Sequence, residues 1–264
     1  MPEGDTVYQA ARRLDAALRG KVLTGCDVRV PRFATVDLSG QTVHAVVSRG
    51  KHLLMRVGES TIHSHLKMEG VWQVYPTGGR WRRPAHEARI VLDTADVQAV
   101  GFALGVLEIL PTADEDEAVG YLGPDLLGPD WDAAEAERRL RAEGSRPIGI
   151  AILDQRVMAG LGNVYRSEIC FLRGVLPTRP VDETPDLPAW IDLSRRVIVA
   201  NRDRPERIFT GNTRRGQGTW VYGRAGKPCR RCGTPIRMEW LGDPVMEGRG
   251  STDRQAFWCP RCQS

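Results

Sequence analysis

Two pairs of cysteines near the end of the chain constrain its fold more than any other feature. Cys229 and Cys232 are separated by two residues, as are Cys259 and Cys262. Each gap lets both thiolates reach one ion, and two such pairs suit the tetrahedral four-thiolate site of structural zinc. We therefore expect one structural Zn2+ as cofactor, with redox pairs or disulfides as the alternatives. The spacing between the pairs exceeds the usual range of roughly 15–20 residues and predicts a long hairpin or loop around Met246–Thr252.

Length and composition indicate a folded chain of two or three domains. Its 264 residues are 41% hydrophobic and 27% charged, values that disfavour a disordered chain. A membrane-spanning helix requires about 18 consecutive apolar residues. The sequence contains no such run, so we expect no membrane-spanning segment. Because the opening residues are acidic and no apolar stretch follows them, we expect no signal peptide.

Positive charge is concentrated at the end of the chain. The formal net charge is +4, and residues 216–264 alone hold eight basic and four acidic residues. A small basic segment suits a polyanionic partner, although a generic basic tail would give the same count. Only four of the 37 basic residues are lysines. Each lysine is therefore a candidate for proton transfer, which arginine cannot perform.

The pattern of apolar residues divides the chain into regions of different structure. Residues 5–19 carry a helical stripe of apolar side chains that ends before Gly20. Short β-branched runs, separated by Gly, Pro and Asp, follow up to about residue 110 and predict a sandwich or barrel. An acidic, turn-like run over 112–117 suggests a linker. We expect helices over 131–142, 148–158, 165–171 and 188–201, then strands and turns over 220–264.

The N-terminus contains a group that could act as a nucleophile. A small second residue such as Pro2 allows removal of Met1, which exposes a secondary amine. An α-amino group titrates at about pH 8, so part of it is unprotonated at neutral pH and could attack a sugar C1′ to form an iminium. Glu3 beside it could transfer protons. A proline that merely begins a helix is the alternative.

Two turns carry polar groups in places suited to a ligand. Lys51 follows Gly50 between two strand-like runs, where a hairpin can project its ammonium group; a solvated hairpin lysine is the alternative. Further along, Gly160–Asn163 separates two helical segments. Backbone N–H groups at the start of the second helix, with Asn163 as an added donor, could hold a phosphate. An ordinary helix corner with Asn163 as its cap would show the same pattern.

Five segments, in this order, resemble the formamidopyrimidine-DNA glycosylase/endonuclease VIII family of bifunctional DNA glycosylases. They span nearly the whole chain: Met1–Gly4, Ser48–Lys51, Ser64–Gly70, Leu153–Glu168 and Val221–Gln263. The opening Met-Pro-Glu-Gly-Asp-Thr-Val is most similar to the actinobacterial endonuclease VIII-like branch.

The resemblance implies an α+β multidomain fold with DNA in the cleft between its lobes. The expected parts are an N-terminal catalytic β-sandwich with a leading helix (1–118), a helix–two-turn–helix DNA-binding domain (119–216) and a zinc finger (217–264). The implied partner is damaged DNA, single- or double-stranded. We expect a monomer in the bacterial cytoplasm, associated with the nucleoid.

The resemblance also implies roles for individual residues. Pro2 is the Schiff-base nucleophile, Glu3 the proton donor and Lys51 the acid for β-elimination. Arg254 matches the finger arginine that assists δ-elimination, and Asn163 matches the residue that grips the phosphate beside the lesion.

One loop is expected to fill the gap that a flipped nucleotide leaves. A damaged base must leave the stack before its glycosidic bond can be reached, so a wedge is required. Lys67, Met68 and Glu69 occupy the family's loop with this task, and Met68 is the expected wedge.

The implied activity is that of a DNA glycosylase and AP lyase of base excision repair. The Asp-Pro-Arg-Arg-Phe-Gly motif of 8-oxoguanine-directed members is absent, and Asp96–Phe102 stands roughly in its place. This departure argues for oxidised pyrimidines as substrates. A purine-directed glycosylase and a non-catalytic damaged-DNA binding protein are the alternatives.

Overall fold

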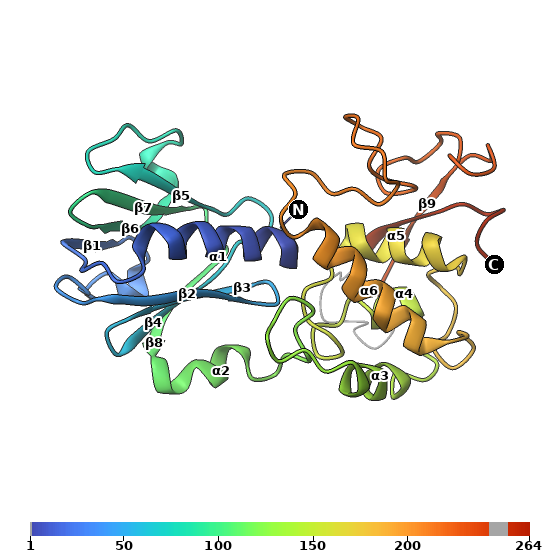
Figure 1. The fold of residues 1–264 in the computed structure, drawn as a ribbon, viewed down its shortest axis with the longest axis horizontal. Coiled ribbons are helices and arrows are strands. Elements are labelled where there is room, and N and C mark those ends of the chain that lie inside the picture. The colour runs from blue at the N-terminus through green and yellow to red at the C-terminus, as the bar shows by residue number, and fades with distance from the viewer. Residues whose placement is uncertain (1, 243–252) are drawn as a thin grey trace. The chain divides into compact units, whose positions relative to one another are not determined.

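A computed structural model describes residues 2–242 and 253–264 (Figure 1). The chain divides into two compact units, Met1–Tyr121 and Leu122–Ser264. In the described residues, the first unit contains one long helix and eight strands, and the second contains helices followed by a two-stranded sheet. Each unit has an apolar core of its own.

The first unit begins with helix α1, Gly4–Leu18, as the apolar stripe predicted. The residues of the stripe, Val7, Ala11, Leu14 and Leu18, are all buried. The helix ends because Gly20 adopts a φ of +78°, a conformation that other residues rarely adopt. The Gly20 N–H then donates to the Val43 carbonyl at 2.8 Å and leads the chain into the sheet.

Two antiparallel four-stranded sheets follow, which confirms a sandwich and excludes a barrel. One sheet has the order β1-β6-β7-β5, and the other has the order β2-β3-β4-β8. Helix α1 contacts strands of both sheets, and the apolar residues of the helix and the two sheets form one core. The strands are β1 Gly25–Val28, β2 Val43–Arg49, β3 His52–Val57, β4 Ser60–His65, β5 Val71–Pro76, β6 Ala88–Asp93, β7 Val97–Phe102 and β8 Val106–Pro111. Short 3-10 helices are η1 Pro31–Phe33, η2 Ala85–Glu87 and η3 Thr112–Asp114.

Strand register brings three loops to one end of the second sheet. His52, the first residue of β3, pairs with His65, the last residue of β4, and His65 pairs with Val106, the first residue of β8. The β2–β3 turn, the β4–β5 turn and the β7–β8 loop therefore emerge at the same end. We call this the turn end of the sandwich.

The acidic run over 112–117 is not the linker that its composition predicted. It forms η3 and the short helix α2, Glu115–Val119. The Glu115 carboxylate accepts hydrogen bonds from Arg56 at 2.8 and 2.7 Å and from the Thr61 hydroxyl at 2.6 Å. A carboxylate held by three charge-assisted or short hydrogen bonds fixes this segment to the sheet.

The second unit is helical as expected, with one difference. Its helices are α3 Ala133–Arg141, α4 Ile148–Ala151, α5 Asn163–Arg173 and α6 Leu187–Asn201. The helix predicted over 148–158 ends at Ala151. The Asp154 carboxylate accepts the Arg156 N–H at 2.9 Å, and the Gln155 side chain bonds the Leu161 carbonyl and the Gly160 N–H. These side chains replace helical backbone bonds and stop the helix.

The last segment contains strands and turns, as predicted. Strands β9, Arg237–Leu241, and β10, Arg254–Trp258, pair antiparallel, and Trp258 lies opposite Arg237. The long loop predicted around Met246–Thr252 lies outside the described residues. Among the helices that the structure describes, none combines the length and apolar character needed to cross a membrane.

Candidate active site

The start of α1 places an acidic side chain in the interior beside Pro2. Glu3 is fully buried, and its carbonyl accepts the N–H groups of Thr6 and Val7 at 3.0 and 3.1 Å. Glu3 itself has an extended conformation, with φ −126° and ψ −175°. The chain therefore enters the helix in one fixed direction, and the half-buried Pro2 is attached to a rigid element.

Lys51 occupies a two-residue hairpin turn. Arg49 pairs with His52, so Gly50 and Lys51 alone connect β2 to β3. Gly50 has a φ of +56°, which suits the first central position of a type II′ turn, where glycine is favoured. The turn fixes the backbone from which the Lys51 side chain projects.

The predicted wedge lies at the tip of a tight turn between β4 and β5. The Gly70 N–H donates to the Leu66 carbonyl at 2.9 Å, and a Cβ atom at Gly70 would lie 2.4 Å from that oxygen. Lys67 adopts a φ of +51°, and its N–H donates to Nδ1 of His65 at 2.9 Å. The turn leaves Met68 64% exposed, as a side chain that inserts into a base stack requires.

The beginning of α1 lies at the turn end as well. Asp15 Oδ1 accepts the Val46 N–H at 2.8 Å, and Gly20 contacts Val43, so α1 runs antiparallel to β2. From Asp15 back to Glu3 the helix covers roughly 18 Å, and the same length of strand, about five or six residues, leads from Val46 to the Gly50–Lys51 turn. Figure 1 shows the start of α1 and the β2–β3 turn at one end of this unit. The structure thus brings Pro2, Glu3 and Lys51 to the end where Met68 emerges.

A chain of hydrogen bonds that the sequence did not predict crosses the outer face of the second sheet. The Glu108 carboxylate lies 2.9 Å from Nδ1 of His63, and Nε2 of His63 lies 2.8 Å from Nδ1 of His52. Nε2 of His52 lies 3.0 Å from the hydroxyl of Tyr121, which is 49% exposed. Both ring nitrogens of His52 and both of His63 therefore have hydrogen-bond partners, and the chain connects the Glu108 carboxylate to the Tyr121 hydroxyl.

Burial keeps His52 and His65 neutral. Burial, reinforced by the neighbouring His65, His63, Lys67 and Lys51, lowers the pKa of His52 to about 3. Burial and the two lysines likewise lower the pKa of His65 to about 4. Near neutral pH, His52 and His65 therefore add no imidazolium charge to the turn end. The sequence did contain a signal for this cluster, because three of the five histidines of the chain lie within fourteen residues of one another.

In the second unit, Asn163 and the backbone of Arg254 lie together. Asn163 is the first residue of α5, yet its side chain does not cap the helix. Its amide nitrogen donates to the Gln255 carbonyl at 2.9 Å, and it is only 7% exposed. Among the residues that the structure describes, Gln255 supplies the one acceptor to this amide nitrogen, which carries a second hydrogen. The Arg254 side chain, on the adjoining residue of β10, is exposed.

Helix α5 also anchors the segment that leads into the cysteines. The fully buried Glu168 carboxylate accepts the backbone N–H groups of Trp220, Val221 and Tyr222 at 2.8, 2.9 and 2.8 Å. Burial raises the pKa of Glu168, while these three bonds favour its charged form. The sequence signal for this contact was an acidic residue directly before the apolar run Ile169–Leu172.

Replacing Glu168 by glutamine should destabilise the second unit. The amide offers one acceptor oxygen and turns an NH2 group toward backbone donors, so we expect the free energy of unfolding to fall by about 2–3 kcal/mol. Chemical denaturation monitored by tryptophan fluorescence measures the change. Glu137→Gln is the matched control, because that carboxylate pairs with Arg141 on the solvent side of α3 and should change stability by less than about 1 kcal/mol.

The four predicted cysteine ligands form one cluster. Their Sγ atoms all lie within 4.8 Å of one another, and Cys232 Sγ is 3.4 Å from Cys259 Sγ. A zinc ion bound to four thiolates separates their sulfur atoms by about 3.8 Å, given its Zn–S bonds of about 2.3 Å. The pairing of β9 with β10 explains the cluster, because one cysteine pair precedes β9 and the other follows β10. The donor set therefore fits a metal ion.

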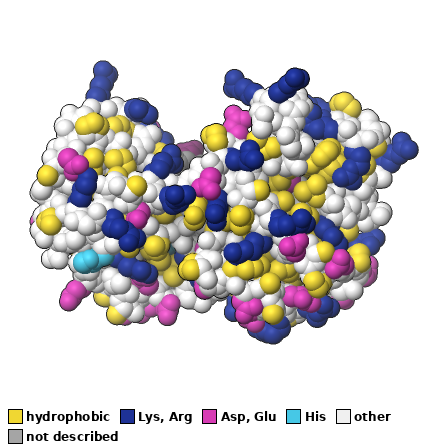
Figure 2. Space-filling view, viewed as in Figure 1, with side chains coloured by type: hydrophobic (Ala, Val, Ile, Leu, Met, Phe, Trp, Pro, Cys, Tyr) yellow, Lys and Arg dark blue, Asp and Glu magenta, His cyan; other side chains and the backbone are white. Residues whose placement is uncertain are grey.

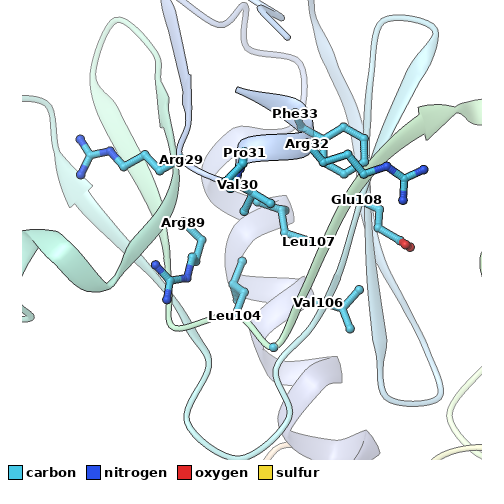
Figure 3. Close-up of a pocket in the computed structure, with 11 residues that line it drawn as sticks. Arg29, Val30, Pro31, Arg32, Phe33, Arg89, Leu104, Val106, Leu107 and Glu108 are labelled. Atoms are coloured by element: carbon cyan, nitrogen blue, oxygen red, sulfur yellow. The ribbon is translucent and has the colours of Figure 1, made fainter. Parts of the chain in front are cut away.

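A pocket of about 380 Å3 in the first unit contains none of the predicted site residues (Figure 3). Apolar side chains such as Leu104 and Leu107 line it, and Arg29, Arg32 and Arg89 surround them. At the turn end, Lys67, Met68 and Glu69 are exposed, which suits contact with a macromolecular substrate. On the face shown in Figure 2, basic side chains are spread over both units with acidic side chains among them.

Comparisons with known proteins agree with this arrangement. Residues 1–103 match the formamidopyrimidine-DNA glycosylase N-terminal domain, and residues 122–185 match the formamidopyrimidine-DNA glycosylase H2TH domain. The chain is 57% identical to "Probable endonuclease 8 2" of Streptomyces coelicolor, with 100% of the chain and 94% of that protein covered. It is 53% identical to "DNA-(apurinic or apyrimidinic site) lyase Nei2" of Mycolicibacterium smegmatis, with 100% and 99% covered.

A solved structure shows the same fold. The Lactococcus lactis Fpg protein, crystallised with DNA containing an abasic site, superimposes with a TM-score of 0.82 at 22% identity, and both chains are covered completely. The helix-led sandwich, the helical domain and the four-cysteine cluster are the parts that the sequence predicted. This chain belongs to the formamidopyrimidine-DNA glycosylase/endonuclease VIII (Fpg/Nei) family, and its relatives place it in the actinobacterial endonuclease VIII-like branch.

Proposed function

We propose that this protein is a bifunctional DNA glycosylase and AP lyase that removes oxidised bases, preferentially pyrimidines, during base excision repair. The observation that carries the proposal is the convergence of the Pro2–Glu3 helix start, the Lys51 turn and the Met68 turn at one end of the sandwich. The Mycolicibacterium relative, named as an AP-site lyase, supports the same activity.

The first chemical step uses the N-terminus. Met68 fills the space of the nucleotide that is turned out of the stack. The Pro2 amine attacks C1′, and the bond from C1′ to the damaged base breaks as Glu3 supplies a proton. Opening of the sugar ring then gives an iminium that joins the proline nitrogen to C1′. This step requires that Met1 has been removed.

Strand cleavage follows from the charge of the iminium. It acidifies the C2′ proton, which is lost to water, and the C3′–O3′ bond breaks while Lys51 acts as the acid. In the second elimination the C4′ proton is lost and the C5′–O5′ bond breaks. Arg254 cannot deprotonate, so it stabilises the charge of the departing phosphate. A reaction that uses both sets of residues requires the DNA to contact both units.

The second unit contributes binding groups and a metal. Asn163 would hold the phosphate beside the lesion with its remaining amide hydrogen. We assign the four-cysteine cluster to one Zn2+ ion, which when bound stabilises the finger and takes no part in the chemistry. The domains proposed are the catalytic sandwich, 1–118, the helix–two-turn–helix domain, 119–216, and the zinc finger, 217–264. The protein would act as a monomer on damaged DNA in the bacterial cytoplasm.

A panel of single-lesion oligonucleotides tests the proposed specificity. Because the arginine-rich purine-directed motif is absent, we expect 5-hydroxyuracil and thymine glycol to be excised at least about tenfold faster than 8-oxoguanine, a difference of about 1.4 kcal/mol in activation free energy. Single-turnover excision rates in duplex and single-stranded DNA measure it. Faster removal of 8-oxoguanine would reverse the assigned preference, and strand cleavage of a preformed abasic site serves as the control for active protein.

A further inference from the structure

Arg166 is the fourth residue of α5. It is a fully buried cation that the reaction described above does not use. Its Nη2 atom donates to the carbonyls of Arg254 at 3.3 Å and Gln255 at 3.0 Å. The same nitrogen donates to the side-chain oxygen of Asn163. One guanidinium therefore bonds the helix start and the finger strand, which are about ninety residues apart in the sequence.

Arg166 contacts two residues with proposed roles in DNA binding and strand cleavage, Asn163 and Arg254. Asn163 bonds the Gln255 carbonyl through its amide nitrogen and Arg166 through its amide oxygen, so both ends of the amide are oriented. Because the Arg254 carbonyl is held while its side chain is exposed, Arg166 fixes the position and direction from which that side chain leaves β10.

The burial of this charge needs a reason beyond packing. Removing a guanidinium from water costs several kcal/mol, and an apolar side chain of similar volume often stabilises a protein at least as well. A guanidinium can, however, draw polar groups to one point in a fixed direction, which an apolar side chain cannot. Here three oxygen atoms, from Asn163, Arg254 and Gln255, converge on its Nη2 group. Arg166 is therefore suited to orientation of its partners rather than to stability alone.

We propose that Arg166 is a positioning residue that sets the second elimination step by holding Arg254 and Asn163 in one orientation. The inference rests on the proposed lyase function and extends it. Loss of the guanidinium leaves the Pro2, Glu3 and Lys51 machinery of the first unit untouched. Base removal and β-elimination should therefore continue, whereas δ-elimination, which depends on the direction of the Arg254 side chain, should decline.

The ratio of the two cleavage products tests the proposal. Zinc-loaded wild type, Arg166→Met, Arg166→Lys and Arg254→Ala are incubated with a 5′-labelled duplex that contains a preformed abasic site. The β product ends in an unsaturated aldehyde and the β,δ product in a 3′ phosphate, and a gel separates them. Both products come from the same folded molecules, so a variant that only reduces the folded fraction leaves their ratio unchanged.

We expect the δ to β ratio to fall at least about tenfold in Arg166→Met and in Arg254→Ala. Arg166→Lys should lie between these variants and wild type, because an ammonium retains the charge and can donate to one or two of these oxygens but is shorter and lacks the planar, directed Nη2 group. Arg173→Met is the matched control: it also removes an α5 arginine, which pairs with Asp186, and should leave the ratio unchanged. If Arg166→Met folds poorly, Arg166→Lys provides the decisive measurement.

Each other outcome contradicts the inference in a recognisable way. An unchanged ratio in the Arg166 variants, with a reduced ratio in Arg254→Ala, would show that Arg166 is only structural. A reduced ratio in the Arg166 variants alone would show that it does not act through Arg254. If wild type fails to cleave abasic DNA at all, the proposed lyase function itself is wrong.

Discussion

Pro2→Gly should abolish the covalent complex that borohydride traps between this protein and abasic DNA. A secondary amine forms an iminium that is charged without further protonation, whereas the primary amine of glycine gives an imine that must first gain a proton. Glycine also lacks the ring that fixes φ at the start of α1. We expect trapping and strand cleavage to fall by at least about a thousandfold, as measured by denaturing gel electrophoresis after reduction.

A blocked N-terminus provides the matched control for this prediction. A variant that retains a residue before Pro2 keeps the proline ring but converts its amine into an amide, which cannot attack C1′. Both variants should still bind DNA that carries a tetrahydrofuran abasic analogue, since the binding groups are unchanged. Mass spectrometry first establishes that Met1 is absent from wild type. Covalent adduct formation by the blocked variant would exclude Pro2 as the nucleophile.

Cys232→Ser should remove the metal and DNA binding together. A serine hydroxyl remains protonated at neutral pH, so the site loses one of four thiolates and much of a binding free energy that reaches about 10–16 kcal/mol in zinc-finger peptides. Without the ion, little holds the two cysteine pairs together around the β9–β10 hairpin, and Arg254 loses its defined position. We expect about one zinc per chain in wild type, almost none in the variant, and at least about 100-fold weaker DNA binding.

Elemental analysis and fluorescence anisotropy at one fixed salt concentration measure these two quantities. Cys26→Ser is the control, because Cys26 lies in β1 of the first unit and is not a member of the cluster. It should keep its zinc and its affinity. Complete loss of metal from Cys232→Ser with unchanged DNA cleavage would remove the role assigned to the finger.

Local patterns were sufficient to predict much of the fold. The apolar stripe of α1, the β-branched runs of the sandwich and the two cysteine pairs each depend on residues within a few positions of one another, and the structure contains all three. The prediction of a helix over 148–158 was wrong because the side chains of Asp154 and Gln155 form hydrogen bonds with nearby backbone groups. Apolar periodicity does not reveal that competition.

Such local patterns could not predict contacts between residues that are far apart in the sequence. His52 and His63 become neighbours only through strand pairing, and their partner Tyr121 lies sixty-nine residues beyond His52. Arg166 sits in a helix whose apolar face predicted only its burial, yet its acceptors belong to β10. The sequence was sufficient to predict which residues form the site, namely Pro2, Glu3, Lys51, Asn163 and Arg254. It did not predict the contacts that orient them.

The pairing of β3 with β4 limits how related chains can vary in length. Side chains alternate between the two faces of a strand, so one inserted residue would exchange the inward and outward sets of everything beyond it. Adding one residue to each strand keeps both faces of the sheet unchanged, and it would move the far connection at Gly58 and Glu59 outward. Within the paired residues of β3 and β4, a change in length among functional relatives should therefore add or remove one residue in each strand, or introduce a bulge such as the register shift between Val43 and Ala45 of β2.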